Sequence, residues 1–267
     1  MKYPCILLII LILFISPSKG QDHKKAEPYA GEQELKRFFC QEAVYPETEL
    51  KAKTEGTVLL TFMVDSLGNI SGMQVKESVS PGLDEEAVRL MGMSLWTPAY
   101  RLGKPISSFV NYPVKFNIKK YKKHCKKRGF TSVDYPYLPL DSSNKVYSSN
   151  EVDEAPSAIF DDPNQHVNKF IMENLKYPEQ AFRQNISGEV VLSFVVETNG
   201  LISHIIPEKP LGGGCTQEAI RIIELLKWMP GIKNNMAVRT KTNMKIIFKL
   251  AENQDLRYVP SGQNQGI

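Results

Sequence analysis

The segment GTVLLTFMVDSLGNIS (56–71) returns later in the chain as GEVVLSFVVETNGLIS (188–203). Apolar and polar residues alternate along each copy, which is the period of a strand with one buried face. The glycine near the end of each copy, Gly68 or Gly200, supplies the positive φ that a tight hairpin turn needs. Each copy therefore predicts a hairpin of two antiparallel strands.

The repeat extends beyond the hairpins under one fixed offset and without a gap. The matched positions are Tyr45-Pro46-Glu47 with Tyr177-Pro178-Glu179, Glu86-Ala87 with Glu218-Ala219, Arg89 with Arg221, Trp96-x-Pro98 with Trp228-x-Pro230, and Phe116 with Phe248. Self-similarity over this length indicates a duplicated structural unit.

Each copy contains the same order of elements. Apolar residues spaced i, i+3, i+4 and i+8 before the Tyr-Pro pair predict a helix, which the proline ends. The hairpin's second strand is expected over 70–76 and 202–206. A second helix follows, with Asp84 and Thr216 as expected N-caps, and an alternating strand closes the copy. We therefore expect an α+β fold of two small domains, each a three-stranded antiparallel sheet with two helices.

The chain of 267 residues has room for two such domains. Their expected limits are 33–118 and 150–250, with a basic then polar linker at 119–149 and a polar tail at 251–267. A net charge of +4 is mild and excludes no class of partner by itself.

The first twenty residues differ in composition from the rest. Lys2 precedes an apolar run from Cys5 to Ile15, and small residues lie before Gln21. This pattern predicts a secretory signal peptide over 1–20. An uncleaved, short inner-membrane anchor is the alternative, although the run is shorter than a spanning helix requires. The expected location is the periplasm, or the inner membrane facing the periplasm if the segment is retained.

Export makes disulfides chemically accessible. Cys40 and Cys125 flank the first copy, so a disulfide between them is one expectation, and Cys215 is interpreted as a small buried residue. The basic run KKYKKHCKKR (119–128) has two interpretations. It contacts an anionic surface, such as lipid headgroups or a cell-wall polymer, or it is the solvated start of a linker. Nucleic acid is not an expected partner of an exported chain.

The ordered pattern Tyr-Pro, Gly-x-Val-x-Leu-x-Phe-x-Val, Gly-x-Ile, Glu-Ala, Trp-x-Pro and a closing strand ending in Phe resembles the C-terminal domain of TonB-family energy transducers. The second copy resembles the form found in Bacteroidetes-type bacteria more closely, so we expect it to be the binding copy. The resemblance covers about residues 33–118 and 150–250.

The resemblance implies a periplasmic domain that adds a short TonB-box-like segment of a TonB-dependent outer-membrane transporter to its last strand. Three-stranded sheets leave unpaired backbone groups on their edges, which is consistent with this mode of binding. The partner-binding positions that the resemblance implies are Ser108, Val110, Asn111, Tyr112, Val238, Thr240, Lys241, Thr242 and Met244. Among them, Thr240, Lys241, Ser108 and Asn111 are expected to point outward.

The resemblance also implies inner-membrane motor proteins as partners of an energy transducer, and a homodimer through the closing strand is a further expectation. The pattern departs from the family in having a short apolar start and no Pro-rich spacer before the first copy. A cell-envelope scaffold or binding protein with tandem domains and no force transduction is therefore the alternative. Without a metal-binding, phosphate-loop or nucleophile motif, the chain is not expected to be an enzyme or to bind a cofactor or metal.

Overall fold

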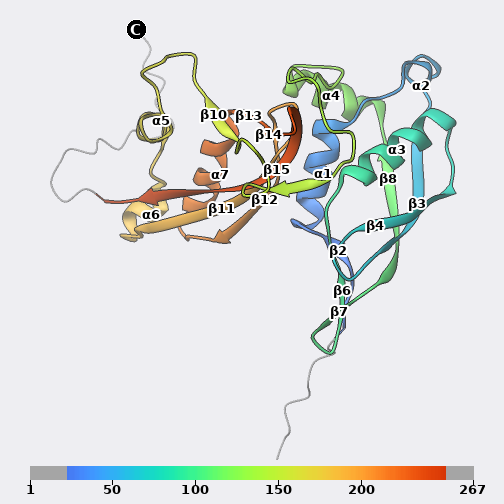
Figure 1. Cartoon of the computed structure of the whole chain (residues 1–267), viewed down its shortest axis with the longest axis horizontal. Helices are drawn as coiled ribbons and strands as arrows, with labels where there is room; N and C mark the ends of the chain where they lie inside the picture. The colour runs from blue at the N-terminus through green and yellow to red at the C-terminus, as the bar shows by residue number, and fades with distance from the viewer. Residues whose placement is uncertain (1–22, 251–267) are drawn as a thin grey trace, which may run out of the picture.

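The computed structural model of the chain describes residues 23–250, so the expected signal segment and polar tail lie outside the described residues. A first unit (residues 23–128) and a second unit (residues 139–250) lie side by side (Figure 1). Each unit combines helices with an antiparallel central sheet. The predicted α+β class is confirmed.

The first unit has a central antiparallel sheet in the order β4–β3–β8. These strands are β3 (Gly56–Val64), β4 (Ile70–Glu77) and β8 (Ser108–Phe116). Its helices are α1 (Gly31–Glu42), α2 (Glu47–Ala52), α3 (Pro81–Met93) and α4 (Ile118–Arg128). Its short strands are β1 (His23–Lys24), β2 (Glu27–Pro28), β5 (Trp96–Thr97), β6 (Ala99–Arg101) and β7 (Lys104–Ile106). The β6–β7 hairpin projects away from the rest of the unit (Figure 1).

The second unit has a larger sheet in the order β12–β11–β15–β14, to which β9 is added. These strands are β9 (Val146–Ser148), β11 (Gly188–Val196), β12 (Ile202–Lys209), β14 (Gly231–Lys233) and β15 (Met236–Phe248). Its helices are α5 (Val167–Asn174), α6 (Glu179–Arg183) and α7 (Cys215–Leu225), and β10 (Ser157–Ile159) pairs with β13 (Lys227–Met229).

Both hairpins form where the repeat predicts them, but other expectations need correction. The second sheet has five strands rather than three, because β9 runs parallel to β15 and β14 folds back on it. The second unit consequently begins before residue 150. The basic run is not a linker but helix α4, which packs beside α1. The first unit therefore extends past residue 118.

The expected N-caps are also wrong by a few residues. Ser80 caps α3, with its hydroxyl accepting from the Leu83 N–H at 3.4 Å, and Gly214 precedes α7 without a side-chain cap. Asp84 lies inside the first turn, where its carboxylate accepts from Val79 N–H. Thr216 donates instead to the Leu211 carbonyl at 2.8 Å. Both polar residues thus stabilise the loop that enters the helix.

Each unit has its own hydrophobic core, and the cores are built from equivalent positions. Val58, Leu60, Phe62 and Val64 are fully buried in the first unit, as are Val190, Leu192, Phe194 and Val196 in the second. The Trp of each Trp-x-Pro pair packs edge-on against the strand's phenylalanine, with ring centroids 5.1 Å apart in both units. The alternation read in the repeat is therefore the core-facing side of β3 and β11.

The Glu-Ala-x-Arg motif of each copy ties α3 to the C-terminal end of α1 in the first unit and α7 to the C-terminal end of α5 in the second. Arg89 donates to the Glu42 carbonyl at 2.7 Å, and Arg221 donates to the Asn174 carbonyl at 2.6 Å. Glu86 pairs with Arg89 in the first unit, in the same way that Glu218 pairs with Arg221 in the second. Carbonyls at a helix C-terminus lack intrahelical partners, so the arginine satisfies one of them.

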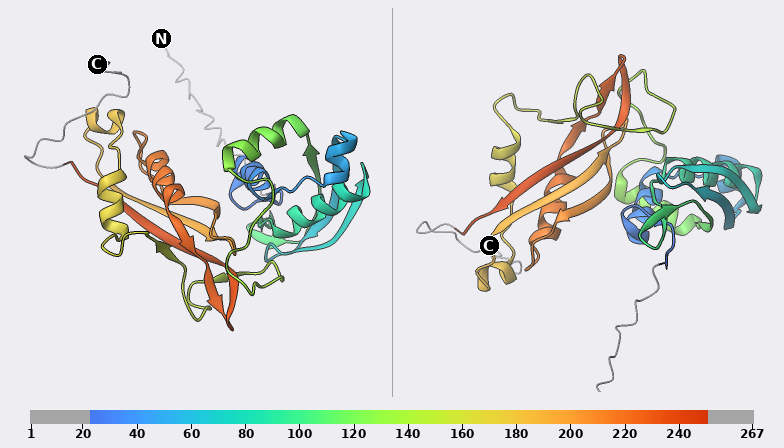
Figure 2. Two further views of the ribbon diagram at one scale, coloured as in Figure 1. Left: turned by 90° about the horizontal axis from the view of Figure 1, so that it is seen from above. Right: turned by 60° about the horizontal axis from the view of Figure 1, so that its bottom comes forward.

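The two units touch through α1 and β12. The ring of His204 lies 4.8 Å from that of Phe38, and the Ile205 N–H donates to Glu34 at 3.2 Å. Figure 2 shows α1 on the side of the first unit that faces the second unit. Helix α1 therefore belongs to the first core and also covers part of the second sheet.

No helix within residues 23–250 is long and apolar enough to cross a bilayer.

Candidate peptide-docking site

The outer edge of β8 is open along its whole length. Within the described part of the chain, β8 pairs only with β3, from Ser108 opposite Val64 to Phe116 opposite Gly56. An edge strand carries N–H and C=O groups that have no partner in its own sheet. Strand β8 therefore offers nine residues of backbone for pairing with another extended chain.

The side chains of β8 alternate between two environments. Tyr112, Val114 and Phe116 are buried against the helices, whereas Asn111 and Pro113 are exposed on the opposite face. A proline within a sheet is confined to positions where its nitrogen faces away from the ladder. Pro113 thus indicates that the backbone groups of the odd-numbered residues of β8 face the open edge, and that one N–H is missing there.

A groove of about 1090 Å³ runs beside this open edge. Its walls come from β8, from α1 and from α4. The wall residues include Phe39 and Cys40 of α1, Tyr112 and Val114 of β8, and Lys120, Tyr121 and His124 of α4. A strand added to β8 would direct alternate side chains into this groove, because strand side chains alternate between faces. The arrangement combines backbone pairing with a pocket for side chains.

Aromatic side chains and one carboxylate shape the groove. The rings of Phe39 and Tyr112 meet edge-on at 6.3 Å, and the Tyr112 hydroxyl donates to Glu32 at 2.9 Å. Burial and the neighbouring Glu32 carboxylate raise the pKa of the Tyr112 hydroxyl, which keeps its proton. Helix α1 is thereby fixed against β8.

The charged groups that line the groove are mainly basic. Glu55 already accepts from the Asn117 side chain at 3.0 Å and from the Ile118 N–H at 2.6 Å. Lys36, Lys115 and Lys120 also line the groove, and of the ion pairs within residues 23–250 only the Lys36–Glu32 contact at 3.7 Å involves them. This balance favours an occupant with acidic side chains.

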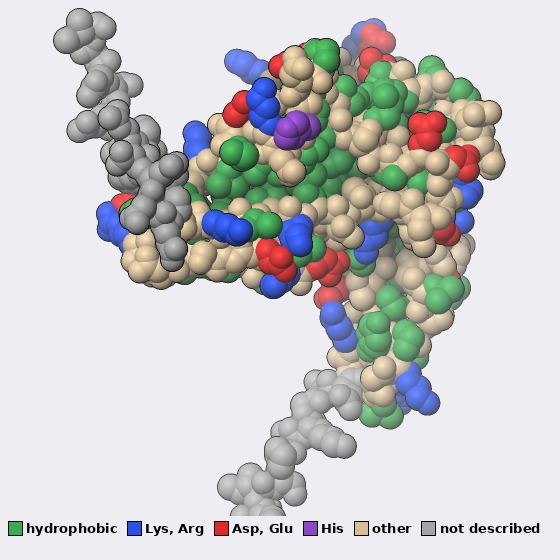
Figure 3. Space-filling view, turned by 60° about the vertical axis from the view of Figure 1, so that its left-hand side comes forward, with side chains coloured by type: hydrophobic (Ala, Val, Ile, Leu, Met, Phe, Trp, Pro, Cys, Tyr) green, Lys and Arg blue, Asp and Glu red, His purple; other side chains and the backbone are tan. Residues whose placement is uncertain are grey.

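The equivalent edge in the second unit is half occupied. On this edge the Ala237 N–H donates to the Pro139 carbonyl and the Ala237 carbonyl accepts from the Asp141 N–H, both at 2.9 Å, and β9 pairs with residues Arg239 to Lys241. From Thr242 to Phe248 no other described strand lies on this edge. Figure 3 shows hydrophobic side chains gathered in a hollow on the α5 and α6 side of this unit.

The structure separates the predicted docking residues into two groups. Ser108, Val110, Asn111 and Tyr112 lie on β8, and Thr242 and Met244 lie on the open half of β15. The two groups belong to different sheets and do not form one site. Asn111 points outward as expected, but Ser108 is only partly exposed.

Two of the second unit's predicted docking positions are buried, and one of them, Thr240, was expected to point outward. Thr240 is completely buried and Val238 is 1% exposed. The physical reason is that residues 139–141 and β9 pair with the outer edge of β15 there. Lys241 is also paired with β9, and it contacts the Tyr29 hydroxyl of the first unit. These three positions are closed to an added strand.

A buried ion pair holds the occupied half of β15 in place. Arg239 donates to both carboxylate oxygens of Glu197, at 2.6 and 2.9 Å, and to the Asn144 carbonyl at 2.8 Å. Burial opposes ionisation of Glu197, but the Arg239 guanidinium holds its pKa below the ordinary value. The segment before β9 is thereby anchored to β15.

The cysteines that were candidates for a disulfide are free thiols in this structure. Cys40 lies on α1 and its sulfur contacts His124 Nε2 at 3.3 Å, whereas Cys125 is buried on the neighbouring helix α4. Burial raises the pKa of the Cys40 thiol, so the sulfur is a weak nucleophile at neutral pH. Cys215 is fully buried, as its interpretation from the sequence expects.

The groove residues of α1 and α4 were not among the predicted docking positions. The basic run carried a usable signal, because Ile118, Tyr121 and Cys125 recur at i, i+3 and i+7 and mark one apolar face of a helix. Their contact with α1 and β8 depends on tertiary packing, which that spacing does not reveal.

Comparison with protein families identifies the architecture. The family model of the Gram-negative bacterial TonB protein C-terminal domain matches residues 41–118 and again residues 173–250. The chain therefore belongs to the TonB C-terminal family and contains two tandem copies of its domain. Domains of this family are energy-transducer or binding domains that generally interact with TonB-dependent transporters, and the family is associated with the Gram-negative cell envelope.

Two further comparisons add little to this assignment. An NMR structure of the Helicobacter pylori TonB C-terminal domain (its residues 179–285) is 13% identical, with a TM-score of 0.26, and the match covers 32% of this chain and 78% of that one. No curated protein matches the chain.

Proposed function

We propose that the first unit docks a TonB-dependent outer-membrane transporter by adding an extended segment of the transporter to β8. The observation that carries this proposal is the groove of about 1090 Å³ beside an unpaired strand edge. Backbone hydrogen bonds along β8 supply affinity, and the groove between α1 and α4 selects side chains. Family membership supports the choice of partner.

The first unit is the better candidate of the two copies, although the sequence favoured the second. All nine residues of β8 have a free outer edge within the described chain, whereas β15 retains only its last seven. The missing N–H at Pro113 interrupts the row of donors on β8. An incoming strand is therefore expected to prefer the register in which none of its carbonyl groups needs a donor at Pro113. This preference contributes to specificity.

A proline substitution on the outer edge of β8 tests the proposal. Asn111→Pro removes an outward N–H and places a ring in the path of the incoming strand, while the pairing of β8 with β3 stays intact. Because the variant loses one backbone hydrogen bond to the added strand and the neighbouring strand pairing, we expect its affinity for a synthetic TonB-box peptide to fall by about 10-fold. Titration calorimetry measures the affinity, and amide chemical shifts of β8 locate the peptide.

Two matched variants make the result specific. Asn111→Ala keeps the backbone donor and is expected to bind like the wild type. Asn243 occupies the equivalent position on β15 and lies on its unpaired half, so Asn243→Pro leaves affinity unchanged if docking occurs on β8. Loss of binding only in Asn243→Pro would move the site to the second unit.

Two other outcomes would contradict the proposal. If no transporter peptide perturbs either edge, the scaffold alternative replaces transporter docking. If β8 instead pairs with a second copy of the chain, Asn111→Pro dissociates a dimer in sedimentation experiments, and peptide titration shows no effect at β8.

A further inference from the structure

Helix α4 carries a surface that peptide docking does not explain. Six lysines lie along its eleven residues, and every one of them is exposed. They are Lys119, Lys120, Lys122, Lys123, Lys126 and Lys127. At ~100° per residue, these positions fall within one arc of about 160° around the helix axis. The lysines therefore form a single face, here called the lysine face.

The opposite side of α4 fixes this face to the first unit. Ile118 and Tyr121 pack against the first core, and Cys125 is buried. Arg128 donates to the Cys40 carbonyl at 2.9 Å, and to those of Gln41 and Ala43 at 2.7 and 2.8 Å, which closes the C-terminal end of α1. The lysine face is thus presented by a rigidly held helix and not by a mobile tail.

The lysine face has no acidic counterpart in the described chain. None of the ion pairs formed within residues 23–250 uses any of the six lysines. The helix itself contains no Asp or Glu. Six like charges on about three turns repel one another, so a dense array of negative charge is the complementary partner.

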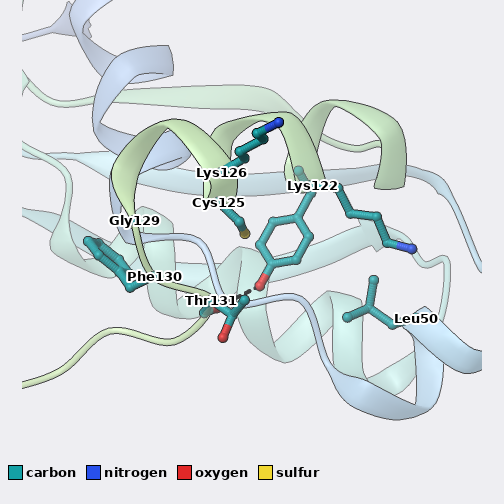
Figure 4. Close-up of a pocket in the computed structure, with 8 residues that line it drawn as sticks. Leu50, Lys122, Cys125, Lys126, Gly129, Phe130 and Thr131 are labelled. Atoms are coloured by element: carbon teal, nitrogen blue, oxygen red, sulfur yellow. Dashed lines mark hydrogen bonds between the residues drawn. The ribbon is translucent and has the colours of Figure 1, made fainter.

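A hollow beside the lysine face indicates which kind of anionic partner fits there. It measures about 590 Å³ and lies between α4, α2 and the segment that follows α4. Figure 4 shows Leu50 and Phe130 at its two ends, with Lys122 and Lys126 on the α4 side. Apolar and cationic groups thus adjoin each other. A phospholipid offers an anionic headgroup next to apolar carbon, whereas a polar polymer offers only the charge.

We propose that α4 docks the protein onto an anionic phospholipid membrane surface, with the lysine face against the headgroups. Basic helical faces bind anionic leaflets by electrostatic attraction, and an adjoining apolar group increases the contact. This surface adjoins the transporter-docking groove of β8: Lys120 of the lysine face also lines that groove, and Tyr121 lines both hollows. The inference does not depend on the proposed function.

Vesicle sedimentation tests the proposal on the chain from Gln21 to Ile267, which contains every residue of both cores. The wild type is expected to bind phosphatidylcholine vesicles that contain about one third phosphatidylglycerol, and not vesicles of phosphatidylcholine alone. Binding is also expected to weaken steeply from about 0.05 M to 0.5 M salt. Equal binding to both vesicle types would refute the electrostatic docking.

A triple variant locates the contact. Lys119→Gln, Lys122→Gln and Lys126→Gln together remove three charges from the face, and glutamine keeps the helix propensity of lysine. Each lysine near an anionic surface raises the affinity for the membrane roughly 5-fold, so we expect the loss of three lysines to lower the affinity for the vesicles by about 100-fold. Circular dichroism and thermal unfolding of the variant show whether the fold is retained.

A second triple variant controls for net charge. Lys76→Gln, Lys104→Gln and Lys249→Gln change the charge equally, at exposed positions outside α4. We expect this variant to bind vesicles within about 3-fold of the wild type. Equal losses in the two triple variants would show that net charge and not the lysine face attracts the membrane. Binding to purified cell-wall sacculi without binding to vesicles would assign the face to the polymer instead.

Discussion

The buried histidine between the two units makes stability depend on pH. His204 is 3% exposed, and its Nε2 accepts from the Leu95 N–H of the first unit at 3.3 Å. Its Nδ1 lies 2.7 Å from the Ser203 hydroxyl. The ring therefore fits this interface in the neutral form, and a proton on Nε2 would remove the acceptor for Leu95.

The size of the effect follows from the pKa of His204. Burial lowers this pKa to about 4, against the partly opposing attraction of Glu197. In the unfolded chain the ordinary histidine pKa of about 6.5 applies. Between these two values the unfolded chain binds more protons, so the free energy of unfolding falls as pH falls. From pH 8 to pH 5 the loss is about 2 kcal/mol.

A variant of His204 distinguishes the contribution of the histidine to the pH dependence from the contributions of the charged groups near it. Glu197, Arg239, Glu34 and Arg37 all act on the histidine. Glu42 opposes the trend, because burial raises the pKa of its carboxyl and favours the folded state at lower pH. In His204→Gln these groups remain, while the amide still offers an acceptor to Leu95. The difference in pH dependence between wild type and variant isolates the histidine.

Urea unfolding at pH 5, 6, 7 and 8 measures the prediction. We expect the free energy of unfolding of the wild type to fall by about 2 kcal/mol more than that of His204→Gln over this range. A constant offset between the two proteins reflects lost packing and does not bear on the argument. Parallel pH profiles would refute it, because they would mean that His204 titrates normally in the folded protein.

Two further predictions concern the anchor of β15 and the hairpin turns. Arg239→Leu leaves Glu197 buried without its partner, so we expect the free energy of unfolding to fall by about 3–5 kcal/mol. Urea unfolding measures this loss through the fluorescence of Trp228, in a background in which Trp96→Phe removes the other tryptophan. A loss below about 1 kcal/mol would show that the ion pair is not closed to water. Gly68→Ala and Gly200→Ala place a Cβ 2.3 and 2.5 Å from the carbonyl oxygen of Trp96 and Trp228, at φ values of +90° and +80°. Each is expected to cost more than about 2 kcal/mol in thermal unfolding, and wild-type melting of either variant would contradict the close approach.

Much of each unit was predictable because the signals are local. The alternation along β3 and β11, the glycine turns and the prolines that end helices all act within a few residues. The repeat strengthened these signals, since two segments with the same pattern predict the same element independently. The family resemblance rested on the same residues, and the match to residues 41–118 and 173–250 confirms it.

The proposed docking site was predictable only in part. The closing strand was expected to carry the edge, and Asn111 does face outward on β8. The occupied half of β15 was not foreseen, because β9 reaches it from a segment read as linker. The groove beside β8 was missed for a related reason: its walls come from α1 and α4, which are separated in sequence by the whole first sheet.

The sequence by itself determined which residues form strands and helices and which side of each one enters its own core, because periodicity records that side directly. It could not determine what covers the other side. Met63 and Val195 are equivalent apolar residues outside the alternating core positions, yet Met63 is half-buried and Val195 is 1% exposed. Only the tertiary structure brings α1 against β12 and the Asn144 segment against β15. That choice depends on contacts such as Arg239 with Glu197 and His204 with Phe38, between residues that are far apart in the chain.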